Sequence, residues 1–223
     1  MQDDPTSPLA EDVPADGAGE TPRVTRKRPK PGERRIQILQ ALAEMLQQPG
    51  AERITTAALA ARLSVSEAAL YRHFASKAQM FEGLIEFIEN SVFTLVNQIA
   101  DREQATPDAV SGNRHAARVV TMVLQFAEKN PGMTRVMVGD ALVFENDRLQ
   151  QRMNQFFDKI EATLRQGLRG GAELSGSATP TVDTQVLASA LTAFVVGRLH
   201  RFARSGFKRA PTEHLDVSLA LML

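Results

Sequence analysis

Side chains that can contact a polyanion are concentrated in one short stretch of the chain. The apolar spacing there predicts a short helix ending near Leu63, which Thr55 or Thr56 can cap at its first turn. A three-residue turn at 64–66 follows, and a second short helix is predicted from about 67 to 74. Two short helices joined by a tight turn are typical of the helix-turn-helix, whose second helix enters the major groove of DNA.

The second of these helices indicates which side chains face the DNA. Ala69 and Leu70 have the spacing of core residues, so the remaining positions of that helix point outward. Thr55 and Thr56 are candidate phosphate contacts, because helix N-termini and short hydroxyl side chains suit phosphate oxygens. Tyr71 can instead be a plain core aromatic, although its hydroxyl is more useful against a phosphate. The candidate DNA-contacting residues are Arg53, Thr55, Thr56, Ser66, Glu67, Ala68, Tyr71, Arg72, His73 and Lys77.

Charge is segregated along the chain, although its formal net charge is zero. Residues 1–20 carry a net charge of −6, residues 21–80 carry +7, and the remainder carries −1. A basic segment is the electrostatic footprint of a phosphate-binding surface, whereas a solvated face is the alternative for a charge run taken alone. Residues 1–32 contain few large apolar side chains, and we expect them to form a disordered arm, first acidic and then basic.

The apolar spacing after this arm is helical almost everywhere, without strand-like alternation. We therefore expect an all-α fold, in which a three-helix DNA-binding head at 33–76 joins a helical-bundle body for dimerisation and partner binding at 77–223. Ser76 and Gln79 have the capping-box spacing that opens a long helix. The other predicted helices span 36–46, 114–128, 133–143, 146–168, 183–204 and the residues from about Thr212, with a long loop between Gly170 and Pro180.

The helix predicted over 183–204 is apolar on several faces, so it must be covered from several sides. It is either central within one chain or part of the contact with a second copy. A homodimer would place two recognition helices about 34–36 Å apart, which is one turn of DNA. The candidate residues of the dimer interface are Leu187, Leu191, Phe194, Val195 and Phe202.

Residue types and their spacing argue against an enzyme and against a metal protein. The chain has no cysteine, its four histidines are scattered without ligand spacing, and no nucleophile–base arrangement is visible. We expect no catalytic residue, no metal and no cofactor. No apolar run approaches the roughly 18 residues that span a bilayer, and the acidic N-terminus is unlike a signal peptide. The expected location is the cytoplasm.

A resemblance to the TetR-type DNA-binding domain is carried by Leu-Tyr-Arg-His-Phe at 70–74 and by the following Ser-Lys, which opens a long helix. More of the chain, about 33–215, is similar to the nucleoid occlusion factors within that family, through motifs at 53–56, 65–74, 84–89, 141–150 and 204–208. This resemblance implies a nucleoid-associated protein that binds palindromic chromosomal sites. It also implies that the DNA-bound form engages the cell-division GTPase FtsZ and blocks ring assembly over the nucleoid.

The same resemblance implies a surface for FtsZ on the helical body. Phe87 falls on that surface, although a core or dimer-interface role independent of FtsZ is an alternative for it. Leu95 stands where the family's surface has an arginine, and Gln125 replaces a small residue. The residues that the resemblance assigns to FtsZ binding are Phe87, Met122, Gln125, Lys129 and Asn130.

A ligand-released transcriptional repressor is the alternative function on the same fold. It requires a pocket in the body with convergent polar and aromatic groups. The chain has one tyrosine, which lies in the head, and no tryptophan. This composition favours a filled core over an aromatic pocket.

Overall fold

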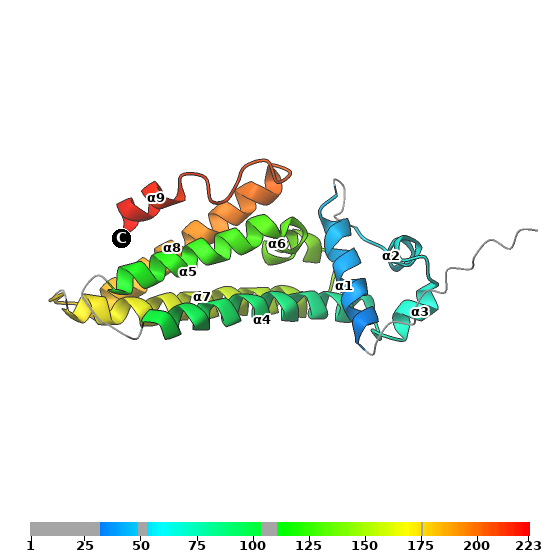
Figure 1. Cartoon of the computed structure of the whole chain (residues 1–223), viewed down its shortest axis with the longest axis horizontal. Coiled ribbons are helices and arrows are strands. Elements are labelled where there is room, and N and C mark those ends of the chain that lie inside the picture. Colours follow the sequence, from blue (N-terminus) through cyan, green and yellow to red (C-terminus); the bar gives the residue numbers. More distant parts are fainter. Residues whose placement is uncertain (1–31, 49–52, 104–110, 175) are drawn as a thin grey trace, which may run out of the picture.

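A group of short helices lies at one end of a longer helical bundle (Figure 1). The computed structural model describes residues 32–48, 53–103, 111–174 and 176–223. These described residues form helices and loops and no strand, which confirms the predicted all-α fold. Apart from Gly32, the arm predicted at 1–32 lies outside them.

The group of short helices, which we call the head, is built around a small shared core. It consists of α1 (Glu33–Leu46), α2 (Thr56–Arg62) and α3 (Glu67–Tyr71). Leu42, Leu59 and Leu70, one from each helix, are buried together with Phe74. Burial of four large apolar side chains provides the main driving force for holding these short helices together, because none of them is long enough to be stable alone.

The turn between α2 and α3 has the geometry of a helix-turn-helix. Ser64 adopts a left-handed conformation with φ of 54°, and the Val65 N–H donates to the Ala60 carbonyl at 3.0 Å. The Val65 side chain packs against the core. Helix α3 ends at Tyr71, earlier than the predicted end at Phe74.

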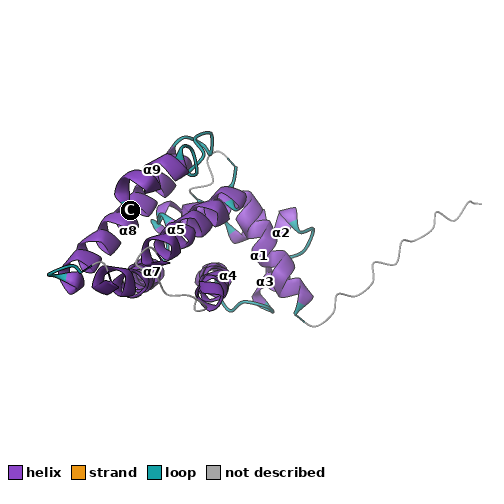
Figure 2. Cartoon of the chain, turned by 60° about the vertical axis from the view of Figure 1, so that its left-hand side comes forward, coloured by secondary structure: helices purple, strands orange, loops and turns teal. Residues whose placement is uncertain are grey.

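The remaining helices form the body. They are α4 (Lys77–Glu103), α5 (Ser111–Lys129), α6 (Pro131–Met137), the 3-10 helix η1 (Asp140–Leu142), α7 (Asp147–Leu174), α8 (Pro180–Arg204) and α9 (Leu215–Met222). Helices α4 and α7 run along the length of the molecule, and α5 and α8 cover them (Figure 1). Seen in the second view, the head lies to one side of this bundle (Figure 2).

Helix α4 starts with the predicted serine cap, but the side-chain hydrogen bond of Gln79 differs from that of a capping box. The Gln79 N–H donates to Ser76 Oγ at 3.2 Å, as expected for an N-cap serine. The Gln79 side chain reaches back further than a capping box requires, and its Oε1 accepts from the Ala75 N–H at 2.8 Å. These two bonds fix the start of α4 directly after the recognition helix.

The loop predicted from Gly170 is wrong, because α7 continues through Gly170 and Gly171 to Leu174. Each glycine disfavours a helix by about 1 kcal/mol relative to alanine. Gly171 is buried, and Arg169 forms an ion pair with Glu173 at 3.0 Å across the same turn. Tertiary packing and this side-chain pair therefore offset the low helix propensity.

Other predicted helix boundaries also differ from the structure, and the helix predicted over 133–143 is divided into α6 and η1. Helix α5 begins at Ser111 and α9 at Leu215, rather than at 114 and about Thr212. Helix α6 begins at Pro131 rather than at 133, so this proline lies in the first turn of the helix. A proline is tolerated there because the first N–H groups of a helix have no partner within the helix.

Helix α4 is tied to α7 by one arginine. The Arg152 guanidinium donates to both carboxylate oxygens of Glu89, from Nε at 3.2 Å and from Nη2 at 2.6 Å. It also donates to the Glu82 carbonyl at 3.4 Å. The hydrogen bond to Glu89 raises the pKa of Arg152 above its ordinary value, so the guanidinium remains charged wherever the protein is folded.

Helix α8 is long and apolar enough, by length and composition alone, to cross a membrane. Its residues Leu191, Val195 and Leu199 are nevertheless buried within the chain, and α8 packs against both α7 and α5. One face of α8 is therefore part of the core of the chain, while the opposite face stays exposed.

The head rests on the body where α1 crosses α6. A Cβ atom built on Gly132 of α6 would lie only 1.9 Å from the Ala43 carbonyl oxygen of α1. Only glycine permits this approach of the two backbones. The contact fixes how close the head lies to the body.

We predict that Gly132→Ala lowers the free energy of unfolding by about 1–3 kcal/mol, because the added methyl group forces α1 away from α6. Gly170→Ala is the control, since a Cβ at that helical position meets nothing within 4 Å. The control should be neutral or stabilise the protein by up to about 1 kcal/mol. Urea unfolding measures both, and a Gly132→Ala variant as stable as the wild type would contradict the close contact.

Candidate DNA interface and partner surface

Thr55 is the N-cap of α2, as the sequence predicts. Its backbone is extended, and its hydroxyl accepts from the Ala58 N–H at 3.2 Å. The Thr55 residue is exposed. Because the hydroxyl uses only an acceptor site for the cap, its proton remains available to donate to a phosphate oxygen.

Two of the predicted DNA-contacting side chains are bonded to each other. Thr56 Oγ1 of α2 donates to Glu67 Oε2 of α3 at 2.5 Å. Ser66, immediately before Glu67, caps α3 by accepting from the Ala69 N–H at 3.3 Å. The bond between Thr56 and Glu67 joins the N-terminal ends of the two helices, and the Ser66 bond caps the second of them. These residues thus have a structural role in addition to their predicted contact with DNA.

The end of α3 and the two residues after it carry predicted reading residues. Tyr71 is 45% exposed, so it is not a core aromatic. Arg72 and His73 are also exposed, whereas Leu70 and Phe74 are buried. The end of the recognition helix therefore presents a phenol to solvent, and the two residues after it present a guanidinium and an imidazole.

Arg35 of α1 is a residue of this region that the sequence reasoning does not select. Its Nη1 donates to the His73 carbonyl at 3.0 Å, and its guanidinium lies 4.1 Å from the centre of the Phe74 ring. It thus fixes the backbone just after the recognition helix. The basic character of the segment is the only sequence signal for it, because the contact spans 38 residues.

Arg53 and Lys77 face the body in this structure. The Arg53 guanidinium lies 5.8 Å from the centre of the Phe144 ring. Lys77 Nζ forms an ion pair with Glu145 Oε1 at 2.5 Å. Contact of these two cations with DNA stays a prediction.

Phe87, the first of the residues assigned to partner binding, is exposed on α4. Its side chain is 49% exposed and Leu95, two turns further on, is 39% exposed. A role for Phe87 in the core of the chain is therefore wrong. Its two remaining roles, in contact with FtsZ or with a second copy, both require this exposure.

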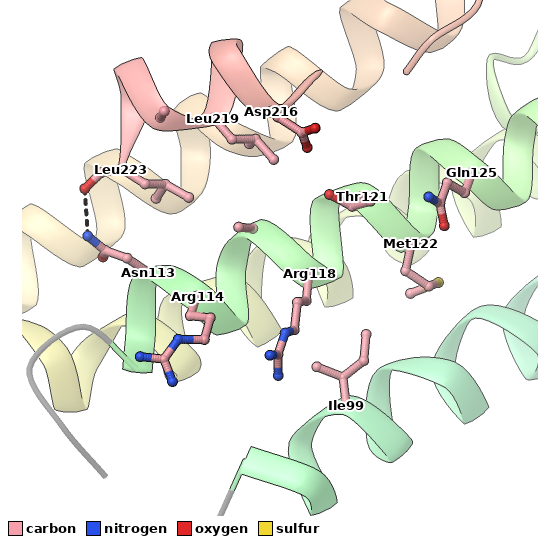
Figure 3. Close-up of a pocket in the computed structure, with 12 residues that line it drawn as sticks. Ile99, Asn113, Arg114, Arg118, Thr121, Met122, Gln125, Asp216, Leu219 and Leu223 are labelled. Carbon is pink, nitrogen blue, oxygen red and sulfur yellow. Dashed lines mark hydrogen bonds between the residues drawn. The ribbon is translucent and has the colours of Figure 1, made fainter. Parts of the chain in front are cut away.

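Met122 and Gln125 line an open groove of about 610 Å³ along α5. Figure 3 shows Arg118 and Met122 on the side of α5 toward Ile99 of α4, while Thr121 lies on the side toward α9. The end of α9 is fixed to α5 by Asn113, whose Nδ2 donates to the Leu223 carbonyl at 2.6 Å (Figure 3).

The other two assigned residues, Lys129 and Asn130, lie at the end of α5. Lys129 is exposed, and the Asn130 amide donates to the Phe126 carbonyl at 2.7 Å. Four of the five assigned residues thus follow one another along α5 and its end, and Phe87 comes from α4.

The predicted dimer contacts on α8 need correction. Leu191, Val195 and Phe202 are buried within the chain itself, so their side chains cannot meet a second copy in this conformation. Leu187 and Phe194 are half-buried and pack against the core. For these two, contact with a second copy stays a prediction.

A head of short helices on a helical bundle is shared with several solved structures. The TetR-family regulator PfmR from Thermus thermophilus superposes with a TM-score of 0.66 at 21% identity, over 84% of this chain and 97% of that one. The regulator FadR from Bacillus subtilis, in complex with stearoyl-CoA, superposes with a TM-score of 0.65 at 16% identity, over 84% and 96% of the two chains. These likenesses show the fold.

Two family descriptions match the sequence: bacterial regulatory proteins of the tetR family over residues 38–84, and the SlmA-like, tetracyclin repressor-like C-terminal domain over residues 114–223. The fold, together with the match of the head to the tetR family, defines a DNA-binding regulator of the TetR family. The nucleoid occlusion factor SlmA of Photobacterium profundum is 54% identical over 188 residues, which cover 84% of this chain and 92% of that protein. The SlmA of Vibrio cholerae serotype O1 is 52% identical over 190 residues, covering 85% and 93%. The chain belongs to the SlmA family of nucleoid occlusion factors.

Two substitutions of Thr55 separate its capping role from its predicted contact with phosphate. Thr55→Ala removes the cap and should cost about 1 kcal/mol of folding stability as well as DNA affinity. Thr55→Asp keeps the cap but places a negative charge beside the phosphate path. We therefore expect Thr55→Asp to unfold like the wild type in urea and yet to bind all duplexes more weakly. Wild-type affinity in Thr55→Asp would remove Thr55 from the DNA interface.

Proposed function

We propose that this chain is a homodimeric protein of the cytoplasm and nucleoid that binds palindromic DNA and, when DNA-bound, antagonises FtsZ ring assembly over the chromosome. The head, 33–76, is the DNA-binding domain in this proposal, and the body, 77–223, provides dimerisation and partner binding. The exposed face of α3, on a chain 54% identical to a SlmA, is the observation that supports it most directly.

An exposed stripe on α8 supports the homodimer. Val182 and Val186 are 59% and 64% exposed, and exposed small residues continue the same face along the helix. The members of this stripe are Val182, Val186, Ser189, Ala190, Ala193 and Gly197. Small residues let two helix backbones approach closely, so a second α8 can pack against this face.

In a two-fold symmetric dimer, the two heads together would read a palindrome. A dimer built on α8 and the neighbouring α7 would present two copies of α3, and about 34–36 Å between them matches one helical turn of DNA. Each α3 would then meet an equivalent half-site.

The exposed side chains on α4 and α5 support a protein partner for the body. Phe87 and Leu95 are large apolar residues that are exposed to solvent. The groove that contains Met122 and Gln125 is lined mainly by apolar and uncharged polar groups. Two arginines and one aspartate complete its lining. An apolar surface with a charged rim is typical of a protein-binding site. We infer that FtsZ occupies it.

A ligand-responsive repressor is the second candidate function. The groove along α5 has a volume within the range of small-molecule sites, and FadR from Bacillus subtilis carries stearoyl-CoA on the same fold. Release of DNA by a small molecule would support this candidate over the first.

The test is sedimentation of FtsZ polymers with this protein, with a duplex that the protein selects from a random pool, or with a scrambled duplex at matched salt. We expect the selected duplex alone to switch on binding or disassembly of the polymers. If the protein binds its duplex and leaves FtsZ unaffected under all conditions, the repressor candidate replaces the first.

The dimer is tested by placing charge on the exposed stripe of α8. Ala193→Glu should convert the dimer to a monomer in sedimentation equilibrium, because two carboxylates would be buried against each other. Ala57→Glu, at an exposed alanine of α2 in the head, is the control and should remain dimeric. A dimeric Ala193→Glu would place the interface elsewhere.

A further inference from the structure

The turn after η1 brings one carboxylate and one aromatic ring of the body to the head. Val143 and Phe144 are 69% and 67% exposed, although Ala141 and Leu142 just before them are buried. The side chain of Glu145 is only 10% exposed and is paired with Lys77 at 2.5 Å, a residue 68 positions earlier in the chain. We call residues 143–146 the junction turn.

Two cations expected to contact DNA meet this turn, Arg53 from the head and Lys77 from the start of α4, where the head joins the body. Lys77 is the first residue of α4, directly after the cap that follows the recognition helix. Arg53 lies two residues before Thr55, the N-cap of α2, and its guanidinium is over the Phe144 ring. One short segment of the body therefore holds a cation on either side of the two DNA-reading helices.

The pairing of Lys77 has an electrostatic consequence for DNA binding. Its side chain is 28% exposed, so the ammonium is held within a partly buried contact rather than extended into solvent. A phosphate that approaches it must share the ammonium with Glu145 or displace that carboxylate, because the two anions repel each other at short range. Glu145 thus lowers the attraction of Lys77 for a phosphate in the DNA-free protein.

Besides the Lys77 contact, the junction turn is held by hydrogen bonds to its neighbours in the chain, among them the Arg148 N–H, which donates to Asn146 Oδ1 at 3.0 Å. The Glu145 N–H donates to the Leu142 carbonyl at 2.9 Å, and the Leu149 N–H donates to the Asn146 carbonyl at 2.9 Å as α7 begins. The turn connects η1, which packs against α6, with the start of α7. Loss of the Lys77 contact would therefore loosen the segment between two body helices.

We propose that Glu145 and Phe144 are positioning residues for DNA binding: they hold Lys77 and Arg53 in the free protein, and DNA phosphates take over both cations and release the junction turn. The inference rests on DNA binding by the head and is independent of FtsZ. It assigns to the body a direct contact through which phosphate binding reaches the start of α7.

The test is a double-mutant cycle on DNA affinity, measured by fluorescence anisotropy across a salt series. Glu145→Gln keeps a hydrogen-bond acceptor for Lys77 but removes the charge, so we expect DNA to bind about threefold to tenfold more tightly with an unchanged salt slope. Lys77→Met should weaken binding and lower the slope of log K against log salt by about 0.9, the value for one phosphate. In the Lys77→Met background, Glu145→Gln should have no further effect.

Asp147→Asn is the matched control, since it removes the same charge from an exposed side chain two residues further on. It distinguishes release of Lys77 from a general reduction of negative charge near DNA. Equal gains from Glu145→Gln and Asp147→Asn, or a gain from Glu145→Gln that persists with Lys77→Met, would overturn the proposal. So would wild-type affinity in Glu145→Gln. A wild-type protein that binds no duplex at all would instead overturn DNA binding itself.

Hydrogen exchange provides a second readout, since a purely structural role of Glu145 predicts no faster exchange of the turn when DNA binds to the wild type. On addition of the selected duplex, we expect the amides of Glu145 and Leu149, which donate the bonds of the turn, to exchange faster in the wild type. In Glu145→Gln they should already exchange faster without DNA. Slower or unchanged exchange in the DNA-bound wild type would contradict release of the junction turn.

Discussion

Because α4 is one continuous helix, a change in the orientation of the head must be absorbed by its contacts with the body. The first turns of α4 pack against α1, and its later turns bury Ile88, Val92 and Val96 in the bundle. The Arg152–Glu89 pair fixes the middle of α4 to α7, and the approach of Gly132 to Ala43 fixes α1 to α6. The head can therefore not rotate freely about a linker. It can move only against packed neighbours, which have few alternative arrangements.

This constraint gives a physical basis for a protein whose partner binding depends on DNA. Lys77 and Phe87 lie on the same helix ten residues apart, which is about 15 Å along its axis. The first is a candidate contact for phosphate and the second for FtsZ. A shift of α4 when DNA binds would move both, and the junction turn adds a second route through the start of α7. Under the proposed function, no separate signalling element is needed between the two surfaces.

The head could be predicted from sequence because the interactions that shape it are local. The caps at Thr55 and Ser66 and the turn at Ser64 each involve residues a few positions apart. The body was harder to predict for a physical reason: a helix that is apolar on several faces does not reveal whether its own chain or a second copy covers it. Leu191 and Val195 were therefore assigned to a dimer interface, whereas the structure buries them within the chain. Contacts such as Lys77–Glu145 depend on residues far apart in sequence, and no periodicity indicates them.

The central claim, that the DNA surface and the FtsZ surface are coupled through the body, has a thermodynamic consequence that one measurement tests. If DNA raises the affinity for FtsZ by some factor, FtsZ must raise the affinity for DNA by the same factor. The measurement is the Kd for the selected duplex, by fluorescence anisotropy, without FtsZ and with FtsZ at saturation. The account predicts that FtsZ lowers the Kd for DNA. The factor should equal the one by which saturating DNA lowers the Kd for FtsZ. A DNA Kd that FtsZ leaves unchanged would contradict coupling and leave a DNA-binding dimer with two independent surfaces.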